Sequence, residues 1–335
     1  MRSQNAMLRY LFFFFFFLPL FLSVSTSSSD YCDPSSLPDQ LLLRSDQLTV
    51  LLSGYSPLRL PLLRRLALSY SSHPSVAAVL LLWFNPSHPP PYHLFSSISS
   101  SISVIPHSPN SSSSLNLRFL PRPQILTRFV AVADDDVSVP HPSLSFAFSV
   151  FRSLPNPKPL VGFFPRSHDL DIPSRDWIYT VHRDRYSILL TKFVILTADL
   201  LREYSCDPAL AAPRRWVDRQ RNCEDILMNF VAARATGVGP VMVAAEGIRD
   251  YGDPRNSVKD GAANLKAREE EVRRVGLSSR GGDGHWRKRG ECIREFHRML
   301  GMMPLRYSYG KVVEGVREQG LCSNGEGKLV LCDQL

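Results

Sequence analysis

The sequence predicts an α/β fold built on a mostly parallel sheet, and three features indicate it. The chain has 335 residues, 44% of them hydrophobic, which is enough to bury the core of one large or two small domains. An apolar run over 48–52 is followed by a helical pattern that begins near Pro61 and by a second apolar run over 76–83. Strand, helix and strand at this spacing are typical of a βαβ unit with parallel strands. Farther on, a buried strand over 129–133 ends in three consecutive aspartates, where ligands bind in such sheets.

Hydrophobic spacing and turn residues predict the other elements. Pro142 opens a helix whose apolar positions, beginning with Leu144, share one face. The polar stretch that contains Trp177 and Tyr179 is expected to be a loop, and the charged, glycine-containing stretch 253–285 a flexible lid or insertion, with a short solvated helix as the alternative. We expect further strands at 102–105, 160–164, 186–196 and 241–245, a helix after Asn222, and a basic amphipathic helix over 286–300.

The first residues have the pattern of a secretory targeting segment. Arg2 and Arg9 precede an uncharged run over 11–22 that includes six consecutive phenylalanines. This run is shorter than the roughly 20 residues that span a membrane, so residues 1–28 are either a cleaved signal peptide or a short signal-anchor. Both forms direct the chain into the secretory lumen, and the second would make it a type II membrane protein.

Charge and cysteine content narrow the partners and the compartment. The 39 Lys and Arg against 31 Asp and Glu give a net charge of +8, which suits phosphorylated substrates, anionic lipids or nucleic acid. No RNA-recognition, zinc-finger or basic-zipper pattern accompanies the charge, so we expect no nucleic-acid partner. The six cysteines lack CxxC spacing, and their even number favours disulfides in an oxidising compartment. Asn110 begins an N-glycosylation sequon in a serine-rich stretch.

The three aspartates after strand 129–133 are the strongest chemical signal. Asp134, Asp135 and Asp136 repel one another. A hard divalent cation bound through oxygen, with its other positions open to water or substrate phosphates, would compensate them. An acidic turn that caps the following helix would give the same pattern. At this point the residues allow either a metal-assisted nucleotide-phosphate site or a plain turn.

Other titratable residues have ordinary explanations of their own. Asp225 lies in the first turn of a predicted helix, where acids interact favourably with the helix dipole. His168 and His182 are isolated loop histidines, and such residues are usually on the surface. Arg289 belongs to the basic helix, which could be a phosphate clamp, a membrane-surface patch or a solvated face.

Taken in order, several motifs resemble the exostosin-type glycosyltransferases of family 64, and their wording is closest to the plant members. The resemblance covers roughly 48–308. Its most specific motifs are Asn-Cys-Glu-Asp at 222–225 and Met-Pro-Leu-Arg-Tyr-Ser at 303–308. The others are the segment 114–121, the aspartates 134–136, and the segments 162–168 and 186–190.

The resemblance implies a GT-A fold, the Rossmann-like fold of nucleotide-diphospho-sugar transferases, over 45–310, with a C-terminal tail over 311–335. It implies a retaining glycosyltransferase of the Golgi lumen that uses Mn²⁺ or Mg²⁺. The donor would be a nucleotide sugar carrying N-acetylhexosamine or mannose, and the acceptor a glycan or glycosphingolipid. Two other functions stay open: a luminal binding or scaffold protein that kept the fold without turnover, and, less favoured, a metal-dependent phosphohydrolase.

The resemblance also assigns roles to individual residues. Asp136 would be the direct metal ligand, with Asp134 and Asp135 reaching the metal shell, ribose or donor sugar. Asp225 would face the sugar and acceptor. Family members usually have an Asn and an Arg after the first strand, and Arg59 is expected to take over their diphosphate contact from a shifted position. The remaining assignments are Asn116 at the nucleotide and Arg289 against the diphosphate.

A disulfide between Cys223 and Cys292 is a further implication of the resemblance. It would fix the Asp225 helix relative to the Arg289 helix. Cys322 and Cys332 could then form a local loop in the tail, which leaves Cys32 with Cys206.

Overall fold

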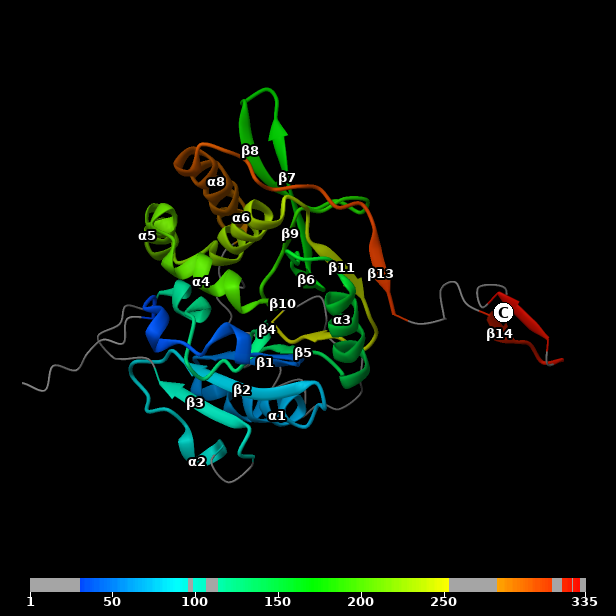
Figure 1. Cartoon of the computed structure of the whole chain (residues 1–335). Helices are drawn as coiled ribbons and strands as arrows, with labels where there is room; N and C mark the ends of the chain where they lie inside the picture. The colour runs from blue at the N-terminus through cyan, green and yellow to red at the C-terminus, as the bar shows by residue number, and fades with distance from the viewer. Residues whose placement is uncertain are drawn as a thin grey trace, which may run out of the picture. The chain divides into compact units, whose positions relative to one another are not determined.

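The structure, a computed structural model, describes residues 31–95, 99–106, 114–252, 282–314, 321–326 and 328–331. Its central element is an eight-stranded sheet with the order β13-β11-β6-β10-β4-β1-β2-β3 (Figure 1). The strands of this sheet are β1 (Arg44–Gly54), β2 (Val76–Trp83), β3 (Ile102–Pro106), β4 (Thr127–Ala133), β6 (Val161–Gly162), β10 (Phe193–Thr197), β11 (Val241–Ala244) and β13 (Lys311–Val313).

Most neighbours in this sheet are parallel. Only β10 runs antiparallel, to β4 on one side and β6 on the other. The central strands are rich in Val, Leu and Ala because both of their faces are covered, which is typical of a parallel sheet between helices. The fold class expected from the sequence, a mixed and mostly parallel sheet flanked by helices, is confirmed.

Helices cover both faces of the sheet. Alternate residues of β4 divide between two cores: Val130 and Val132 face one, Ala131 and Ala133 the other. The first core includes residues of α4, α5, α6 and α8, and the second includes residues of α1 and α3. The helices are α1 (Leu60–Ser71), α2 (Tyr92–Phe95), α3 (His141–Ser153), α4 (Ala198–Cys206), α5 (Ala211–Gln220), α6 (Glu224–Thr236) and α8 (Gly282–Leu300).

Smaller sheets and short 3-10 turns complete the description. The turns include η3 (Pro57–Arg59) and η4 (Leu115–Phe119). The remaining strands are β5 (Val137–Ser138) paired with β12 (Arg249–Asp250), β7 (Pro165–Asp171) between β8 (Asp176–Thr180) and β9 (Ile188–Leu189), and β14 (Leu321–Ser323) with β15 (Leu329–Leu331).

Several predicted elements need correction. The expected loop around Trp177 is the hairpin β7–β8, and β8 packs along α8 (Figure 1). The expected continuous strand 186–196 is broken into β9 and β10. The basic helix begins at Gly282, inside the stretch expected to be a loop, and β13 extends the large sheet into the expected tail. Helices α4 and α5 had no counterpart in the sequence prediction.

Some predictions lie outside the described residues: the targeting segment 1–28, the glycosylation site Asn110, most of the 253–285 loop and the pairing of Cys332. Across the part of the chain that the structure describes, no helix combines the length and apolarity needed to span a membrane.

Candidate functional site

The three aspartates lie where β4 ends, and two arginines hold them. Arg118, from η4, donates to Asp134 Oδ1 at 2.5 Å. Arg59, at the end of η3, forms an ion pair with Asp135 and a second one with Asp136 Oδ2 at 3.1 Å. Both guanidinium groups are buried. Part of the mutual repulsion that the sequence indicated is therefore compensated by cations of the chain itself.

Asp136 is left incompletely paired. Its Oδ1 atom is buried and has no hydrogen-bond partner among the residues that the structure describes. Burial, reinforced by the charges of Asp134 and Asp135, raises the pKa of Asp136 to about 7. Burial also raises the pKa of Asp135, against the opposing charge of Arg59. A buried carboxylate oxygen without a donor is a costly feature that a ligand can relieve.

This donor set suits one kind of metal site. Among the residues with described positions, no group of three or more His, Cys, Asp and Glu side chains is arranged to hold an ion. Asp136 Oδ1 fits a hard cation such as Mn²⁺ or Mg²⁺ that takes only one or two protein oxygens and fills its other positions with phosphate and water. It does not fit a cation enclosed entirely by protein ligands.

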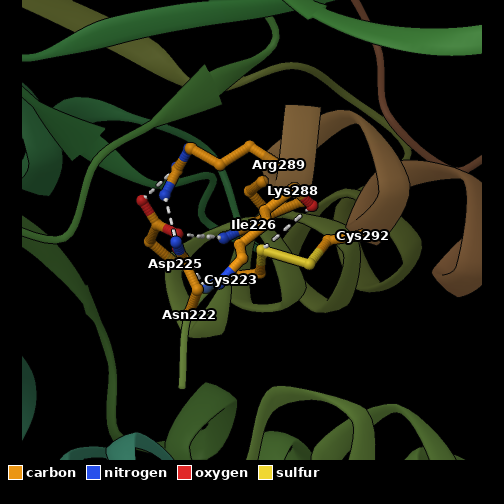
Figure 2. Close-up of a disulfide and its surroundings, with 7 residues drawn as sticks. All are labelled: Asn222, Cys223, Asp225, Ile226, Lys288, Arg289 and Cys292. Carbon is orange, nitrogen blue, oxygen red and sulfur yellow. Dashed lines mark hydrogen bonds and ion pairs between the residues drawn. A yellow bond between two sulfur atoms is a disulfide. The ribbon is translucent and has the colours of Figure 1, made fainter. Parts of the chain in front are cut away.

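A second buried pair, Asp225 and Arg289, joins helices α6 and α8. Arg289 Nη2 lies 2.6 Å from Asp225 Oδ2, and its Nη1 donates to Asn222 Oδ1 at 3.2 Å (Figure 2). The ring of Tyr179, on β8, lies 4.5 Å from the guanidinium carbon. Burial alone would lower the pKa of Arg289, but Asp225 and its neighbours raise it overall, so the guanidinium stays charged.

The local backbone fixes where Asp225 points. Cys223 adopts φ = +77°, a conformation that non-glycine residues rarely adopt, immediately before α6 begins. The disulfide between Cys223 and Cys292 ties this turn to α8, one turn beyond Arg289 (Figure 2). The Cys223–Cys292 disulfide that the family resemblance implied is present. Cys32 and Cys206, the two cysteines that remained after the other expected pairings, also form a disulfide.

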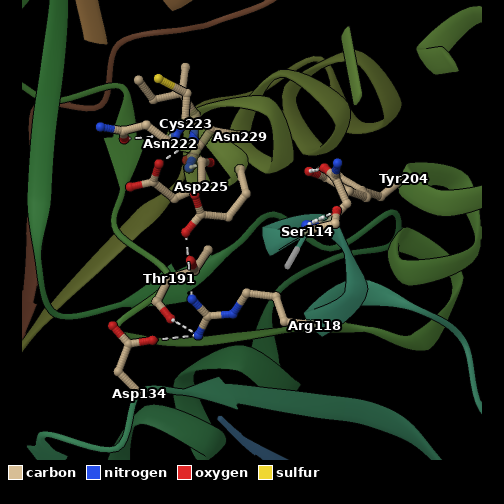
Figure 3. A network of polar contacts seen from close by, with 12 residues as sticks. Ser114, Arg118, Asp134, Thr191, Tyr204, Asn222, Cys223, Asp225 and Asn229 are labelled. Atoms are coloured by element: carbon tan, nitrogen blue, oxygen red, sulfur yellow. Dashed lines mark hydrogen bonds and ion pairs between the residues drawn. The ribbon is translucent and has the colours of Figure 1, made fainter. Parts of the chain in front are cut away.

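Glu224 and Arg118 connect the two groups of charges. Arg118 donates to Asp134 and to the Thr191 carbonyl (Figure 3). Its Nη1 lies 3.6 Å from Glu224 Oε1. Burial and the adjacent Asp225 raise the pKa of Glu224 to about 7. The aspartate cluster and the Asp225–Arg289 pair are thus parts of one polar network.

The structure shows the partners of two further predicted site residues, Asn116 and Arg59. Asn116 donates both amide hydrogens to Asp218 Oδ1 and to the Arg214 carbonyl, and its oxygen accepts from the Tyr204 hydroxyl at 2.5 Å. Both amide hydrogens of Asn116 are therefore used to hold η4 against α4 and α5, and its contact with the nucleotide stays a prediction. Arg59, expected at the diphosphate, is paired with Asp135 and Asp136.

The two loop histidines of the sequence prediction have different environments in the structure. His168 is buried, donates to or accepts from Ser187 Oγ at 2.7 Å and stacks on Tyr307, so it is a core residue and not the surface residue that the sequence suggested. His182 is partly exposed and pairs with Asp169.

Sequence reasoning missed Arg118, Glu224, Lys192 and Asp250 as members of the site. Arg118 and Glu224 do stand inside two of the motifs that carried the family resemblance, which was the available signal. Lys192 pairs with Asp250 at 2.5 Å, and neither residue stands in such a motif.

Comparison with known proteins places this site in a family. The profile of the glycosyl transferase family 64 domain matches residues 48–316. Glycosyltransferase family protein 64 C3 of Arabidopsis thaliana is 50% identical over 325 residues, 94% of each chain. Exostosin-like 2 of Mus musculus is 28% identical over 279 residues, 78% of this chain and 75% of that protein. Glucosamine inositolphosphorylceramide transferase 1 of Arabidopsis thaliana is 29% identical over 248 residues, 73% of this chain but only 29% of that protein.

Proposed function

Because the chain belongs to glycosyl transferase family 64 and is therefore a glycosyltransferase, we propose that it is a metal-dependent, retaining enzyme of the Golgi lumen. The donor is a nucleotide-diphosphate sugar carrying N-acetylhexosamine or mannose, and the acceptor is a glycan or glycosphingolipid. The named activity of the inositolphosphorylceramide relative supports the lipid acceptor. The N-terminal segment, if it is not cleaved, attaches the enzyme to the membrane.

One observation supports this proposal above all: Asp136 Oδ1 is buried and has no partner within the described part of the chain, in a cluster whose carboxylates are paired with Arg59 and Arg118. A bound Mn²⁺ or Mg²⁺ would offset the charge that develops on the departing diphosphate. Asp136 would hold that cation directly, and Asp134 and Asp135 would lie in its surroundings. Arg118 and Arg59 keep the three carboxylates in place, so their arrangement does not have to form during the reaction.

Arg289 acts on the leaving group. Its guanidinium is charged, buried and oriented by Asp225, Asn222 and Tyr179. A buried cation stabilises the negative charge that builds on a diphosphate without transferring a proton to it. Asp225 fixes the guanidinium and faces the donor sugar, where its carboxylate stabilises positive charge at the anomeric carbon or orients the acceptor hydroxyl. No protein nucleophile is needed if the acceptor attacks the face from which the diphosphate departs.

Donor turnover tests this function. The full-length chain is incubated with uridine diphosphate N-acetylglucosamine, its galactosamine epimer or guanosine diphosphate mannose, with Mn²⁺ or with chelator, and nucleotide release is measured. We expect release from one donor, abolished by chelator and reduced at least about 100-fold in Asp136→Ala. Asp171→Ala, on the exposed hairpin, serves as the matched control with activity close to that of the unmodified chain.

The alternative, a binding protein without turnover, predicts a different result. In that case a donor binds in the presence of Mn²⁺ but no nucleotide is released from any of the three. Turnover that persists in chelator and in Asp136→Ala would instead show that the reaction needs neither the metal nor this carboxylate.

A further inference from the structure

A group of residues that the proposed function leaves unused encloses the backbone and one carboxylate oxygen of Asp136. These residues are Lys192, between β9 and β10, and the segment 249–252. We propose that they are positioning residues, a brace that fixes Asp136 so that its free oxygen is available to a divalent cation. The inference rests on the proposed function, since it concerns the carboxylate assigned there to the metal.

Lys192 joins two parts of the brace. Its backbone carbonyl accepts from the Asp134 N–H at 2.9 Å, at the end of β4. Its ammonium group lies 2.5 Å from Asp250 Oδ2. The Asp250 side chain is only 4% exposed, so this ion pair is shielded from water and from salt on the aspartate side. Lys192 therefore fixes the position of β12 relative to the end of β4.

The segment 249–252 then fixes the backbone around Asp136. In the antiparallel pair of β12 with β5, Asp250 lies opposite Val137, the residue after Asp136. The Tyr251 N–H donates to the Asp136 carbonyl at 2.8 Å. The Gly252 N–H donates back to Asp250 Oδ1 at 3.0 Å, which closes the turn. The main chain of Asp136 is thus held from β4 on one side and from β12 on the other.

Gly252 makes the closest approach to the carboxylate itself. A Cβ atom added at this position would lie well under 3.0 Å from Asp136 Oδ2, the oxygen that also contacts Arg59, and 3.4 Å from Asp250 Oδ1. Only a residue without a side chain can approach so closely. Oδ2 is therefore confined between Arg59 and the Gly252 backbone, while no residue with a described position pairs with Oδ1.

Metal affinity measured without turnover tests this brace. Free Mn²⁺ is titrated by electron paramagnetic resonance with the full-length chain in the presence of uridine diphosphate. We expect Gly252→Ala to weaken Mn²⁺ binding at least about tenfold, because the new methyl group displaces the ligand carboxylate. Gly310→Ala is the matched control, since an added Cβ there meets nothing within 4 Å, and its Mn²⁺ affinity should be unchanged.

A second variant separates positioning from folding. Lys192→Met with Asp250→Asn removes both charges and leaves no buried charge unpaired, so the fold is expected to persist. Thermal unfolding is followed for every variant. Weaker Mn²⁺ binding at a nearly unchanged melting temperature supports the brace, whereas wild-type affinity in both Gly252→Ala and the double variant overturns it. If the unmodified chain itself binds no Mn²⁺, the proposed metal-dependent function is wrong. If the unmodified chain and all the variants bind Mn²⁺ equally, only the brace is wrong.

Discussion

The two carboxylate groups of this site, Asp225 with Arg289 and the cluster Asp134 to Asp136, are both buried but differ in how completely they are paired. Asp225 Oδ1 accepts from the Ile226 N–H at 2.8 Å and Oδ2 from Arg289 at 2.6 Å, so both of its oxygens are used. In the cluster, two arginines contact three carboxylates, and Asp136 Oδ1 has no partner in the described ranges of the chain. Among the described residues, the Asp225 carboxylate is fully paired without a ligand although Arg289 Nε has no hydrogen-bond partner, whereas the Asp136 carboxylate in the cluster is only half paired. A cation therefore gains more at the cluster.

The two groups also differ in what holds them. The Asp225–Arg289 pair depends on two short segments that the Cys223–Cys292 bridge joins covalently. The cluster gathers charged side chains from widely separated parts of the chain, at positions 59, 118, 192 and 250, through ion pairs and strand ends. The first group is expected to be rigid in any ligand state, while the second depends on balanced charges.

Breaking the Asp225–Arg289 pair should have the largest effect on stability and turnover. Arg289→Met leaves Asp225 buried without its partner, which we expect to lower the free energy of unfolding by about 3 to 5 kcal/mol. Donor turnover should fall at least about 100-fold because the charge on the leaving diphosphate loses its stabilising cation. Denaturant unfolding and nucleotide release measure the two effects.

A double variant distinguishes the two roles of the pair. Arg289→Met with Asp225→Asn leaves no buried charge unpaired, so most of the stability should return while turnover stays low. Recovery of turnover together with stability would show that the pair acts only through the fold.

Removing the covalent link should have the next largest effect. Cys223→Ser with Cys292→Ser is expected to cost about 2 to 4 kcal/mol of unfolding free energy. Cys32→Ser with Cys206→Ser is the matched control, because it removes the other described disulfide, which does not connect α6 with α8. We expect both variants to lose stability but only the first to lose turnover by about tenfold at a temperature where both are folded. Equal losses of turnover would remove the special role of the first bridge.

The ionisation of Glu224 should change the stability less than the loss of the disulfide does. It tests the contact that joins the two groups of charges. Its folded pKa is about 7, above the 4.5 of an exposed glutamate. At this site the folded state thus binds more protons than the unfolded state between these values, so the contribution of Glu224 to the free energy of unfolding falls as the pH rises from 4.5 to 7. Glu224→Gln should remove up to about 3 kcal/mol of this decrease. Parallel stability–pH curves for variant and unmodified chain would contradict the assignment.

Local pattern predicted much of this molecule, and long-range contacts account for most of what it missed. Strand β2 has the bounds that were expected, because an apolar run before Asn85-Pro86 has few alternatives. The expected strand 186–196 is divided into β9 and β10, and in β9 the Asn229 side chain takes both backbone groups of Leu189, with 2.9 Å to its N–H and 2.8 Å to its carbonyl. Nothing near residue 189 in the sequence reveals a partner forty positions away.

Contacts between distant parts of the sequence also limited what could be predicted about the site. The three aspartates were visible as consecutive residues, and the family resemblance supplied Asp225, Arg289 and their disulfide. The side chains that balance the aspartates were not visible, because whether Arg59 or Lys192 reaches a carboxylate depends on how distant strands end beside one another. Asn116 shows what a motif position alone leaves out: its side chain contacts α4 and α5, and the nucleotide contact expected for it stays a prediction.

The smallest predicted effect concerns the aromatic ring beneath Arg289. The Tyr179 ring lies 4.5 Å from the guanidinium carbon, and such a contact contributes about 0.5 to 2 kcal/mol. Tyr179→Leu should therefore reduce turnover by about 3- to 30-fold, whereas Tyr179→Phe, which keeps the ring and loses only the hydroxyl, should stay close to the unmodified chain. The Asp225–Arg289 pair would then owe its orientation partly to the hairpin β7–β8. If Phe and Leu are equally impaired, the hydroxyl and not the ring supports Arg289, and the pair is less complete on its own than its two satisfied oxygens indicate.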